Sequence, residues 1–125
     1  MVEGKKILVV EDVELNREIV QEILEDEGMV TDSACDGKEA VEMVAAAESG
    51  EYDAILMDIQ MPVMDGFEAT RQIRQMEGGD GILIVAMSGS AFEEDIQRSL
   101  DAGMDGHLSK PLDADKFIRI LEKHS

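Results

Sequence analysis

The sequence predicts an α/β protein with a single doubly wound sheet of five parallel strands and helices on both faces. Five short apolar segments alternate along the chain with five segments whose apolar residues recur at helical spacing, and the connections between them are short. Alternation of this kind produces β–α–β units, in which helices cover both faces of a parallel sheet. The chain has no internal repeat and no interdomain linker, so residues 1–125 are expected to form one domain.

The strands are predicted from short apolar runs that end at turn signals. Residues 52–57 and 82–87 are apolar almost throughout, which is typical of strands buried on both faces of a sheet. Residues 5–10 are rich in β-branched side chains and form the first strand. Residues 29–34 are less apolar, which favours an edge position, and residues 105–108 form a brief last strand.

The helices are predicted from apolar residues that recur every three or four positions. In the first helix Leu15, Ile19 and Ile23 are spaced by four, with Val20 and Leu24 beside them, and Gly28 ends it. Two helices cover about residues 38–49 and 65–76, a third ends at Ala102–Gly103, and the last covers about residues 113–123. Their apolar faces comprise Ala40, Val41, Val44 and Ala47; Phe67, Ala69, Thr70, Ile73 and Met76; Phe92, Ile96 and Leu100; and Phe117, Ile118 and Leu121.

Composition limits the classes of partner. Acidic residues outnumber basic ones by 29 to 11, giving a net charge of −18, so direct binding to nucleic acid or to anionic membranes is not expected. No apolar run approaches the ~20 residues needed to cross a bilayer, and no secretory signal is recognisable, so membrane insertion is not expected. The single Cys35 is expected to be a small buried residue, and its lack of an internal partner suits a cytoplasmic location.

Polar side chains follow four of the predicted strands. Glu11 and Asp12 come directly after the first strand, Asp58 after the third, Ser88 after the fourth and Lys110 after the fifth. Because the carboxyl ends of parallel strands meet at one edge of a sheet, these residues are expected to converge there, where open α/β sheets bind their ligands. The second strand ends at Ala34-Cys35 and contributes nothing comparable, which indicates a site rather than general acidity.

The expected cluster has a definite chemistry. Two carboxylates about 4 Å apart repel each other by about 4 kcal/mol at an effective dielectric constant of ~20, so three acids must hold a proton or a cation. Carboxylate oxygens suit Mg²⁺. A carboxylate beside Mg²⁺, with an ammonium and a hydroxyl aimed at the same point, is equipped to accept a phosphoryl group, and Asp is known to form an aspartyl phosphate.

Four motifs in order along the chain resemble those of one family. They are Val9-Val10-Glu11-Asp12, the run from Leu56 to Gly66 (LMDIQMPVMDG), Ala86-Met87-Ser88 and Ser109-Lys110-Pro111. Together they resemble the response-regulator receiver domain of two-component signalling. The sequence of residues 61–66 is most similar to that of receivers in hybrid histidine kinases. The resemblance extends over essentially the whole chain and implies a flavodoxin-like strand order of 2-1-3-4-5.

The resemblance also implies roles for the acids. Asp58 resembles the phospho-acceptor. Asp12, Asp58 and the backbone carbonyl of Gln60 resemble the Mg²⁺ ligands, with Mn²⁺ as a substitute ion, and Glu11 would act on the metal through water. The domain would catalyse its own phosphorylation and a slow self-dephosphorylation without being a turnover enzyme.

The remaining motif positions resemble a switch. Ser88 matches the hydroxyl residue that turns to the new phosphoryl group, and Lys110 matches the lysine that pairs with it. His107 stands at the switch position, where the family usually has Tyr or Phe. The Lys110–Pro111 peptide bond is expected to be cis, an isomer that X–Pro bonds adopt at modest cost.

The implied partners are a histidine kinase or a histidine phosphotransfer protein, together with a downstream domain or protein that the motifs do not identify. Three alternatives stay open. A metal-dependent phosphohydrolase would need a general acid at Gln60, two positions after Asp58. A pseudo-receiver would bind partners without accepting phosphate. A flavin or dinucleotide binder would need a Gly-rich loop where Glu11-Asp12-Val13 stands.

Overall fold

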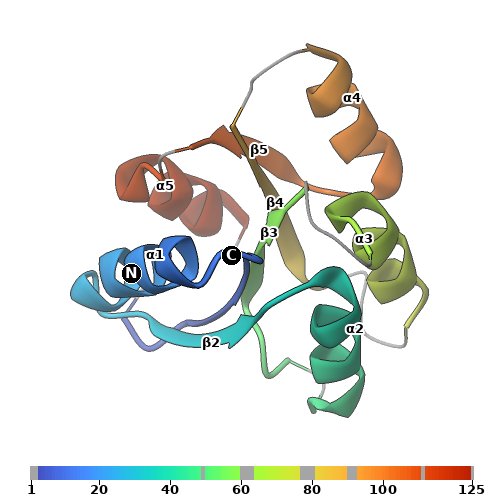
Figure 1. The fold of residues 1–125 in the computed structure, drawn as a ribbon. Helices are drawn as coiled ribbons and strands as arrows, with labels where there is room; N and C mark the ends of the chain where they lie inside the picture. Colours follow the sequence, from blue (N-terminus) through green and yellow to red (C-terminus); the bar gives the residue numbers. More distant parts are fainter. Residues whose placement is uncertain are drawn as a thin grey trace.

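The computed structural model describes residues 3–48, 50–59, 64–76, 81–89, 93–110 and 112–124. Within these ranges five strands alternate with five helices, as the sequence predicts (Figure 1). The strands are β1 (Lys6–Val10), β2 (Val30–Ala34), β3 (Ala54–Asp58), β4 (Leu83–Ser88) and β5 (Gly106–Ser109). The helices are α1 (Glu14–Asp26), α2 (Gly37–Ala46), α3 (Gly66–Gln75), α4 (Glu93–Ala102) and α5 (Ala114–His124).

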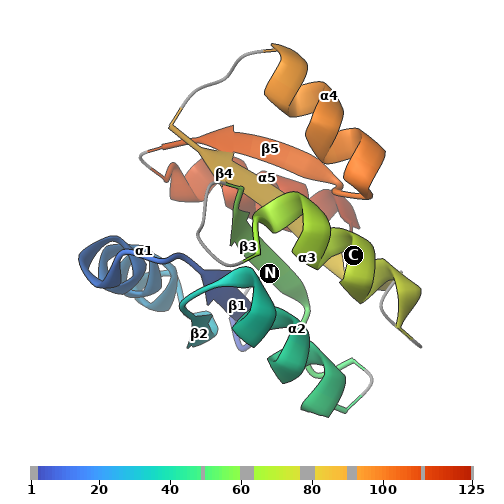
Figure 2. The same ribbon diagram turned by 45° about the vertical axis from the view of Figure 1, so that its right-hand side comes forward.

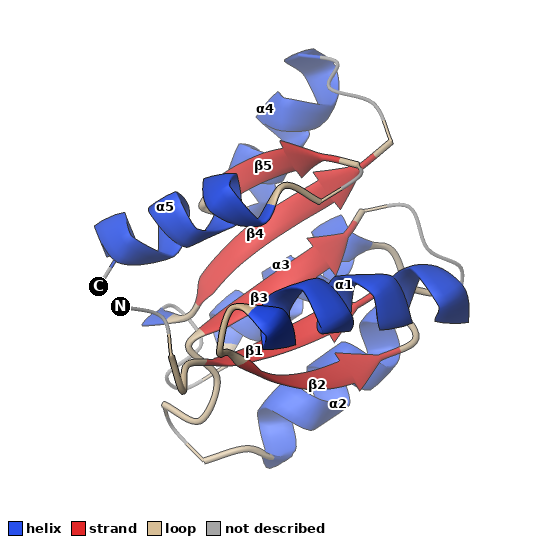
Figure 3. Ribbon diagram, turned by 90° about the vertical axis from the view of Figure 1, so that its left-hand side faces the viewer, coloured by secondary structure: helices blue, strands red, loops and turns tan. Residues whose placement is uncertain are grey.

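The five strands form one parallel sheet in the order β2-β1-β3-β4-β5, which confirms the expected topology. β3 lies at the centre, where Ile55 pairs with Leu8 of β1 on one side and with Ile84 of β4 on the other. The less apolar β2 is an edge strand, as its composition predicts. All five strands run in the same direction, so their carboxyl ends lie along one edge of the sheet (Figure 3).

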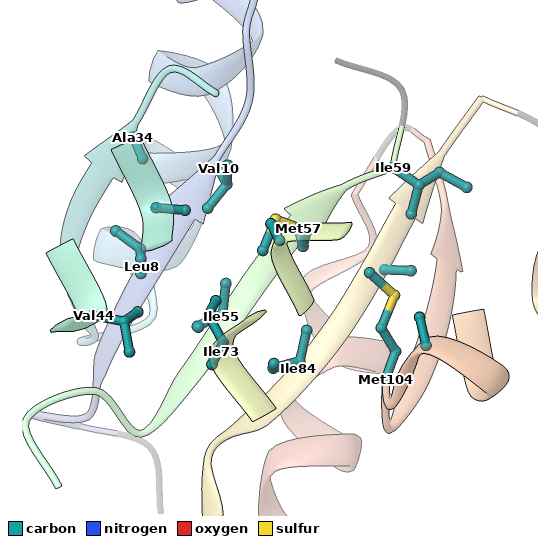
Figure 4. Close-up of a cluster of buried hydrophobic side chains, with 14 of the residues drawn as sticks. Leu8, Val10, Ala34, Val44, Ile55, Met57, Ile59, Ile73, Ile84 and Met104 are labelled. Atoms are coloured by element: carbon teal, nitrogen blue, oxygen red, sulfur yellow. The ribbon is translucent and has the colours of Figure 1, made fainter. Parts of the chain in front are cut away.

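Helices cover both faces of the sheet. α1 and α5 lie in front of it in Figure 3, whereas α2, α3 and α4 lie on the opposite face, which Figure 2 turns toward the viewer. Alternate residues of β3 point to opposite faces of the sheet. Ile55 and Met57 pack toward α2 and α3, and Ala54 and Leu56 pack toward α1 and α5. Figure 4 shows the first of these clusters. The sheet is therefore buried on both faces, as expected from its apolar strands.

Local sequence sets the helix boundaries. Asp36 and Asp65 precede α2 and α3, and the side chain of each accepts a hydrogen bond from the backbone N–H three residues later, at 2.8 Å and 2.9 Å respectively. Gly28 follows α1 with a φ of +93°, a conformation that glycine adopts without the strain that a side chain brings. α2 ends at Ala46 rather than at residue 49, because Ala47 already has extended backbone angles.

Two apolar residues of α1 lie at the surface, although their spacing predicted part of an apolar helix face. α1 packs on the sheet through Val20 and Leu24, while Leu15 is 65% exposed and Ile19 is 46% exposed. With 3.6 residues per turn, Leu15 and Ile19 form a row one residue, or about 100°, away from the row of Val20 and Leu24. The apolar surface of α1 is thus wider than the face that the sheet covers.

Leu100 and Cys35 are also exposed, contrary to expectation. Leu100 is 52% exposed because α4 turns Ser99 and Ala102 inward instead. Cys35 is not a buried filler: its thiol lies 3.3 Å from a carboxylate oxygen of Glu39, and this hydrogen bond raises the pKa of the thiol. Phe92, which was expected on the same face as Leu100, lies outside the described residues.

Arg74 of α3 ties together three segments near the amino ends of β4 and β5. Its guanidinium donates to the carbonyl oxygens of Gly103 at 2.8 Å and Ile82 at 2.6 Å, and to the carboxylate of Asp105 at 2.7 Å. The same Asp105 carboxylate accepts a hydrogen bond from the backbone N–H of Ile84 at 2.9 Å. This cluster stabilises the fold at the edge of the sheet opposite the strands' carboxyl ends.

Candidate functional site

The carboxyl edge of the sheet gathers the polar residues singled out by the sequence. Asp58 is the last residue of β3 and Ser88 the last of β4, while Glu11 and Lys110 directly follow β1 and β5. Asp58, Glu11 and Ser88 are buried, and Asp12, next to Glu11, is more exposed. β1 and β4 are the direct neighbours of β3, and β5 lies beyond β4. The predicted convergence of these residues at one edge of the sheet is therefore confirmed in its geometry.

Lys110 bridges two of the acids. Its ammonium lies 3.0 Å from Oε2 of Glu11 and 3.0 Å from Oδ2 of Asp58. Its backbone N–H donates to the carbonyl oxygen of Ser88 at 2.8 Å, which holds the lysine against the end of β4. A single flexible side chain therefore compensates two carboxylates that the sheet and its helices remove from water.

The protonation properties of the cluster follow from burial and pairing. Burial raises the pKa of Glu11 above its ordinary value, the contact with Asp58 raises it further, and Lys110 acts in the opposite direction. Burial acts to lower the pKa of Lys110, but its hydrogen bonds to Asp58 and Glu11 outweigh burial and raise that pKa. Lys110 therefore stays cationic at neutral pH, while Glu11 gives up its proton less readily than an exposed glutamate does.

The acids fit a hard divalent cation. One carboxylate oxygen from each of Glu11, Asp12 and Asp58 lies within 4.8 Å of the other two. Two oxygens that bind one Mg²⁺ at about 2.0–2.1 Å can lie up to about 4.2 Å apart, so small side-chain movements would bring this set into range. Gln60, whose carbonyl oxygen is the expected third ligand, lies outside the described residues.

Besides the contact with Lys110, three hydrogen bonds fix Glu11, and sequence reasoning did not anticipate the one from α1. The guanidinium of Arg17 donates to the carbonyl oxygen of Glu11 at 3.0 Å. The backbone N–H of Glu11 donates to Ala34 at 3.1 Å, and that of Val13 donates to the Glu11 carboxylate at 3.4 Å. Arg17 lies five residues beyond Asp12, the last residue of the motif, so only its charge near two acids could have indicated this role.

Gly66 allows α3 to begin against the backbone at the end of β3, where Asp58 lies. A Cβ atom added at Gly66 would lie 2.5 Å from the carbonyl oxygen of Asp58 and 2.9 Å from Cα of Ile59. Real Cβ atoms essentially never come so close to other atoms. The sequence marked Asp65-Gly66 as a helix start, and the structure adds a steric reason for glycine at this position.

Ser88 and His107 are in contact. Ser88 Oγ lies 3.2 Å from Nε2 of His107, which is half-buried on β5. The residue at the expected switch position is therefore joined to the expected hydroxyl residue in this structure. Pro111, and with it the isomer of the Lys110–Pro111 bond, lies outside the described residues.

A groove of about 360 Å³ opens beside the acids, between α1 and the segment that follows β5. Ile19 and Ile23 of α1 and Leu112 supply its apolar lining, and Glu11 and Lys110 also line it. The exposed Leu15 belongs to the same helix. An apolar surface thus adjoins the acidic cluster.

Comparison with known proteins identifies the family. The family model of the response regulator receiver domain matches residues 7–122. The chain belongs to this family. It is a receiver domain of two-component systems, a class of signalling modules rather than turnover enzymes.

Receiver domains of known structure share this fold closely. The receiver domain of a sensor histidine kinase from Pseudomonas aeruginosa PAO1 is 38% identical, with a TM-score of 0.86 and 96% of each chain covered. That structure contains a magnesium ion coordinated in the active-site cleft. The receiver domain of Ssk1 from Saccharomyces cerevisiae, crystallised with the histidine phosphotransfer protein Ypd1, is 28% identical with a TM-score of 0.85, covering 98% of this chain and 90% of the other.

Relatives also include receivers within much longer proteins. Hybrid signal transduction histidine kinase B of Dictyostelium discoideum is 41% identical over 96% of this chain, which corresponds to 7% of the kinase. The chain spans only 7–13% of the length of the first hybrid kinases it matches. Among the helices of the described residues, none combines the length and apolar character needed to cross a membrane.

Proposed function

We propose that this receiver domain accepts a phosphoryl group on Asp58 from a phosphohistidine of a histidine kinase or a histidine phosphotransfer protein. The observation that carries the proposal is the position of Asp58, buried at the carboxyl end of the central strand with the ammonium of Lys110 at 3.0 Å. Glu11 and Asp12 complete an anionic cluster around it. An acid in these surroundings has a cation beside it and stands at the carboxyl edge of the sheet, which supports its role as the acceptor.

The transfer is a displacement at phosphorus. A carboxylate oxygen of Asp58 forms the new O–P bond while the P–N bond to the donor imidazole breaks. The electron pair of that bond stays with the imidazole nitrogen, which then takes a proton from solvent. Lys110 remains close enough to pair with the phosphoryl oxygens once its carboxylate partner is esterified, because its Nζ already contacts Asp58.

A divalent cation would complete the site. Asp12, Asp58 and the backbone carbonyl of Gln60 would hold Mg²⁺, with Mn²⁺ as a substitute, and Glu11 would contribute through water. Bound Mg²⁺ would supply charge neutralisation for the transferring group. The acidic cluster supports this assignment, since without a cation Glu11 is held in an environment that raises its pKa. Slow self-dephosphorylation would return the domain to its starting state.

The partner surface is proposed to include α1. Leu15 and Ile19 are exposed on this helix, next to the groove that reaches Glu11 and Lys110. A phosphohistidine carried on a protein must approach the carboxyl edge of the sheet, and an apolar patch beside that edge is suited to hold a protein partner in place.

The free thiol of Cys35 is consistent with the proposed cytoplasmic location.

Intact-protein mass spectrometry tests the acceptor assignment. The protein is incubated with acetyl phosphate, with and without Mg²⁺, in the wild type and in Asp58→Asn. Asp65→Asn is the matched control, because Asn replaces Asp well at a helix N-cap. One phosphoryl group should appear on wild type and on Asp65→Asn only with Mg²⁺, and none on Asp58→Asn. Full labelling of Asp58→Asn would overturn the assignment.

A pair of leucine substitutions tests the partner surface. Leu15→Glu on α1 should slow phosphotransfer from a phosphorylated histidine phosphotransfer protein while leaving labelling by acetyl phosphate intact. Leu100→Glu on α4 introduces the same change at a position of similar exposure away from the groove, and it should leave both reactions unchanged. Equal rates of protein-to-protein transfer for Leu15→Glu and wild type would contradict a role for α1.

A further inference from the structure

The first turn of α2 lies against the backbone that connects β3 to α3. Gly37 is the first residue of α2 and is buried, and a Cβ atom added to it would overlap with the carbonyl oxygen of Met64. The same added Cβ would lie 3.1 Å from Cβ of Ala69, which belongs to α3. Met64 stands directly before Asp65, the N-cap residue of α3. The absence of a side chain at Gly37 therefore lets the start of α2 touch the end of the β3–α3 connection.

The sheet holds the opposite end of this connection. The backbone N–H of Ile59, the residue after Asp58, donates to the carbonyl oxygen of Met87 in β4 at 3.2 Å. The carbonyl oxygen of Ile59 in turn accepts a hydrogen bond from the backbone N–H of Gly66 at 3.4 Å. Because Ile59 is fixed by these two contacts, the path of the connection depends on where its other end, at Met64, is held.

The start of α2 is anchored firmly enough to act as a support. The Asp36 carboxylate accepts a hydrogen bond from the backbone N–H of Glu39 at 2.8 Å, and the Glu39 carboxylate accepts one from the backbone N–H of Cys35 at 3.3 Å. These two contacts hold the residues on both sides of Gly37. A side chain added at Gly37 would therefore displace the Met64 carbonyl rather than the helix.

The path of the connection bears on the metal site, because the connection carries Gln60, whose backbone carbonyl is one of the proposed Mg²⁺ ligands. The following inference rests on the proposed function, in which Mg²⁺ binds beside Asp58. We propose that Gly37 is a positioning residue for this metal site: by admitting the Met64 carbonyl against α2, it sets the path of the connection. The segment after β2, which supplies no member of the acidic cluster of Glu11, Asp12 and Asp58, would thus act on the site through its backbone.

Calorimetric Mg²⁺ titration of the metal-free protein tests this role. Gly37→Ala should weaken Mg²⁺ binding by about 3- to 10-fold, less than the roughly 10- to 100-fold typical of direct partners of metal ligands, because Gly37 acts through intervening backbone. Gly81→Ala is the matched control, since its added Cβ meets nothing within 4 Å, and it should bind like the wild type. Equal affinities of Gly37→Ala and Gly81→Ala would overturn the inference.

A double variant separates the Met64 contact from the packing of α2 on α3, and it replaces Gly37→Ala if that variant does not fold. Ala69→Gly removes the Cβ that the new side chain would meet on α3, but it leaves the Met64 carbonyl in the way. Gly37→Ala combined with Ala69→Gly should therefore bind Mg²⁺ more weakly than Ala69→Gly alone, by the same factor. Equal affinities of these two proteins would attribute the loss to helix packing and overturn the inference.

Labelling by acetyl phosphate provides a second readout. Gly37→Ala should need about 3- to 10-fold more Mg²⁺ for its half-maximal rate and should reach the wild-type rate at saturating Mg²⁺, because Asp58 and Lys110 are unchanged. A lower rate at saturation with an unchanged Mg²⁺ requirement would contradict a role in positioning the metal. Labelling that persists in Asp58→Asn would instead overturn the proposed function, whatever the Mg²⁺ affinities of the glycine variants.

Discussion

The ammonium of Lys110 lies 3.0 Å from Oδ2 of Asp58, a residue 52 positions earlier in the chain. The same ammonium lies 3.0 Å from Glu11, 99 positions earlier. Both carboxylates are buried, whereas Lys110 is partly open to solvent. The pairing therefore has two consequences: it stabilises the metal-free fold, and it leaves the positive charge free to follow a new anionic group.

Replacing Lys110 with Met should destabilise the metal-free protein at neutral pH. Removing one partner of a buried ion pair costs about 3–5 kcal/mol, and the partial exposure of Lys110 lowers the expected loss to about 1–3 kcal/mol. Urea unfolding in the presence of a chelator measures this loss in the free energy of unfolding. Lys6→Met is the matched control, because Lys6 pairs with the more exposed Asp32 and Glu51. A loss for Lys110→Met no larger than that of the control would contradict the account.

Glu11→Gln should change how stability depends on pH. The ordinary pKa of this group is 4.5, and the folded protein raises it, chiefly through burial. The folded state therefore holds the proton better than the unfolded state, so its stabilising effect is complete below pH 4.5 and is lost as pH rises through the folded pKa. As pH rises from 4.5 through the folded pKa of Glu11, the free energy of unfolding of the wild type should fall relative to that of Glu11→Gln. Urea titrations at several pH values without metal measure it, and parallel curves would refute it.

Gly66→Ala should be destabilising even though alanine is the better helix former. Helix propensity alone favours alanine by about 1 kcal/mol, but the added Cβ would press on the Asp58 carbonyl, and overpacking of this kind costs about 1–3 kcal/mol. Phosphorylation by acetyl phosphate should slow as well, since the backbone that must move carries Asp58, the proposed acceptor. Gly81→Ala meets nothing within 4 Å and serves as the control. Equal stability and labelling in the two variants would contradict the steric role.

Arg17→Met should weaken Mg²⁺ binding more than it weakens the fold. The guanidinium of Arg17 donates to the carbonyl oxygen of Glu11 at 3.0 Å and so fixes the turn that carries Glu11 and Asp12. Loss of one such hydrogen bond costs about 0.5–1.5 kcal/mol, which corresponds to roughly a 2- to 13-fold change in an equilibrium constant. Calorimetric Mg²⁺ titration of Arg17→Met and of the exposed Arg71→Met provides the comparison. Identical affinities would show that Arg17 has no influence on the site.

Much of the fold could be predicted because it depends on patterns that are local in the sequence. Short apolar runs such as residues 82–87 locate buried strands, and apolar residues that recur every three or four positions, such as Phe67, Thr70 and Ile73, locate helices. The convergence of Asp58 and Lys110 at one edge follows from parallel strands alone. Their assigned roles as acceptor and pairing cation came from family resemblance and stay predictions until the labelling experiments are done.

The features that sequence reasoning missed depend on how elements pack together. Whether Leu15 or Val20 faces the sheet depends on the rotation of α1 about its axis, and both belong to apolar rows at the same spacing. The exposure of Leu100 is a similar case on α4. Arg17 and Arg74 act through hydrogen bonds to backbone carbonyls, which leave no trace in residue type beyond the presence of an arginine.

The ion pair between Glu11 and Lys110 joins the ends of the first and last strands across 99 positions. An incompletely folded chain already contains the Asp58 carboxylate, but it has neither the flanking acid nor the lysine in place. A contact across so many positions closes a long loop, and the entropy that this costs must be offset by the finished sheet. Acceptor chemistry would thus be confined to molecules that have completed folding, so a nascent or damaged chain could not transmit a false signal.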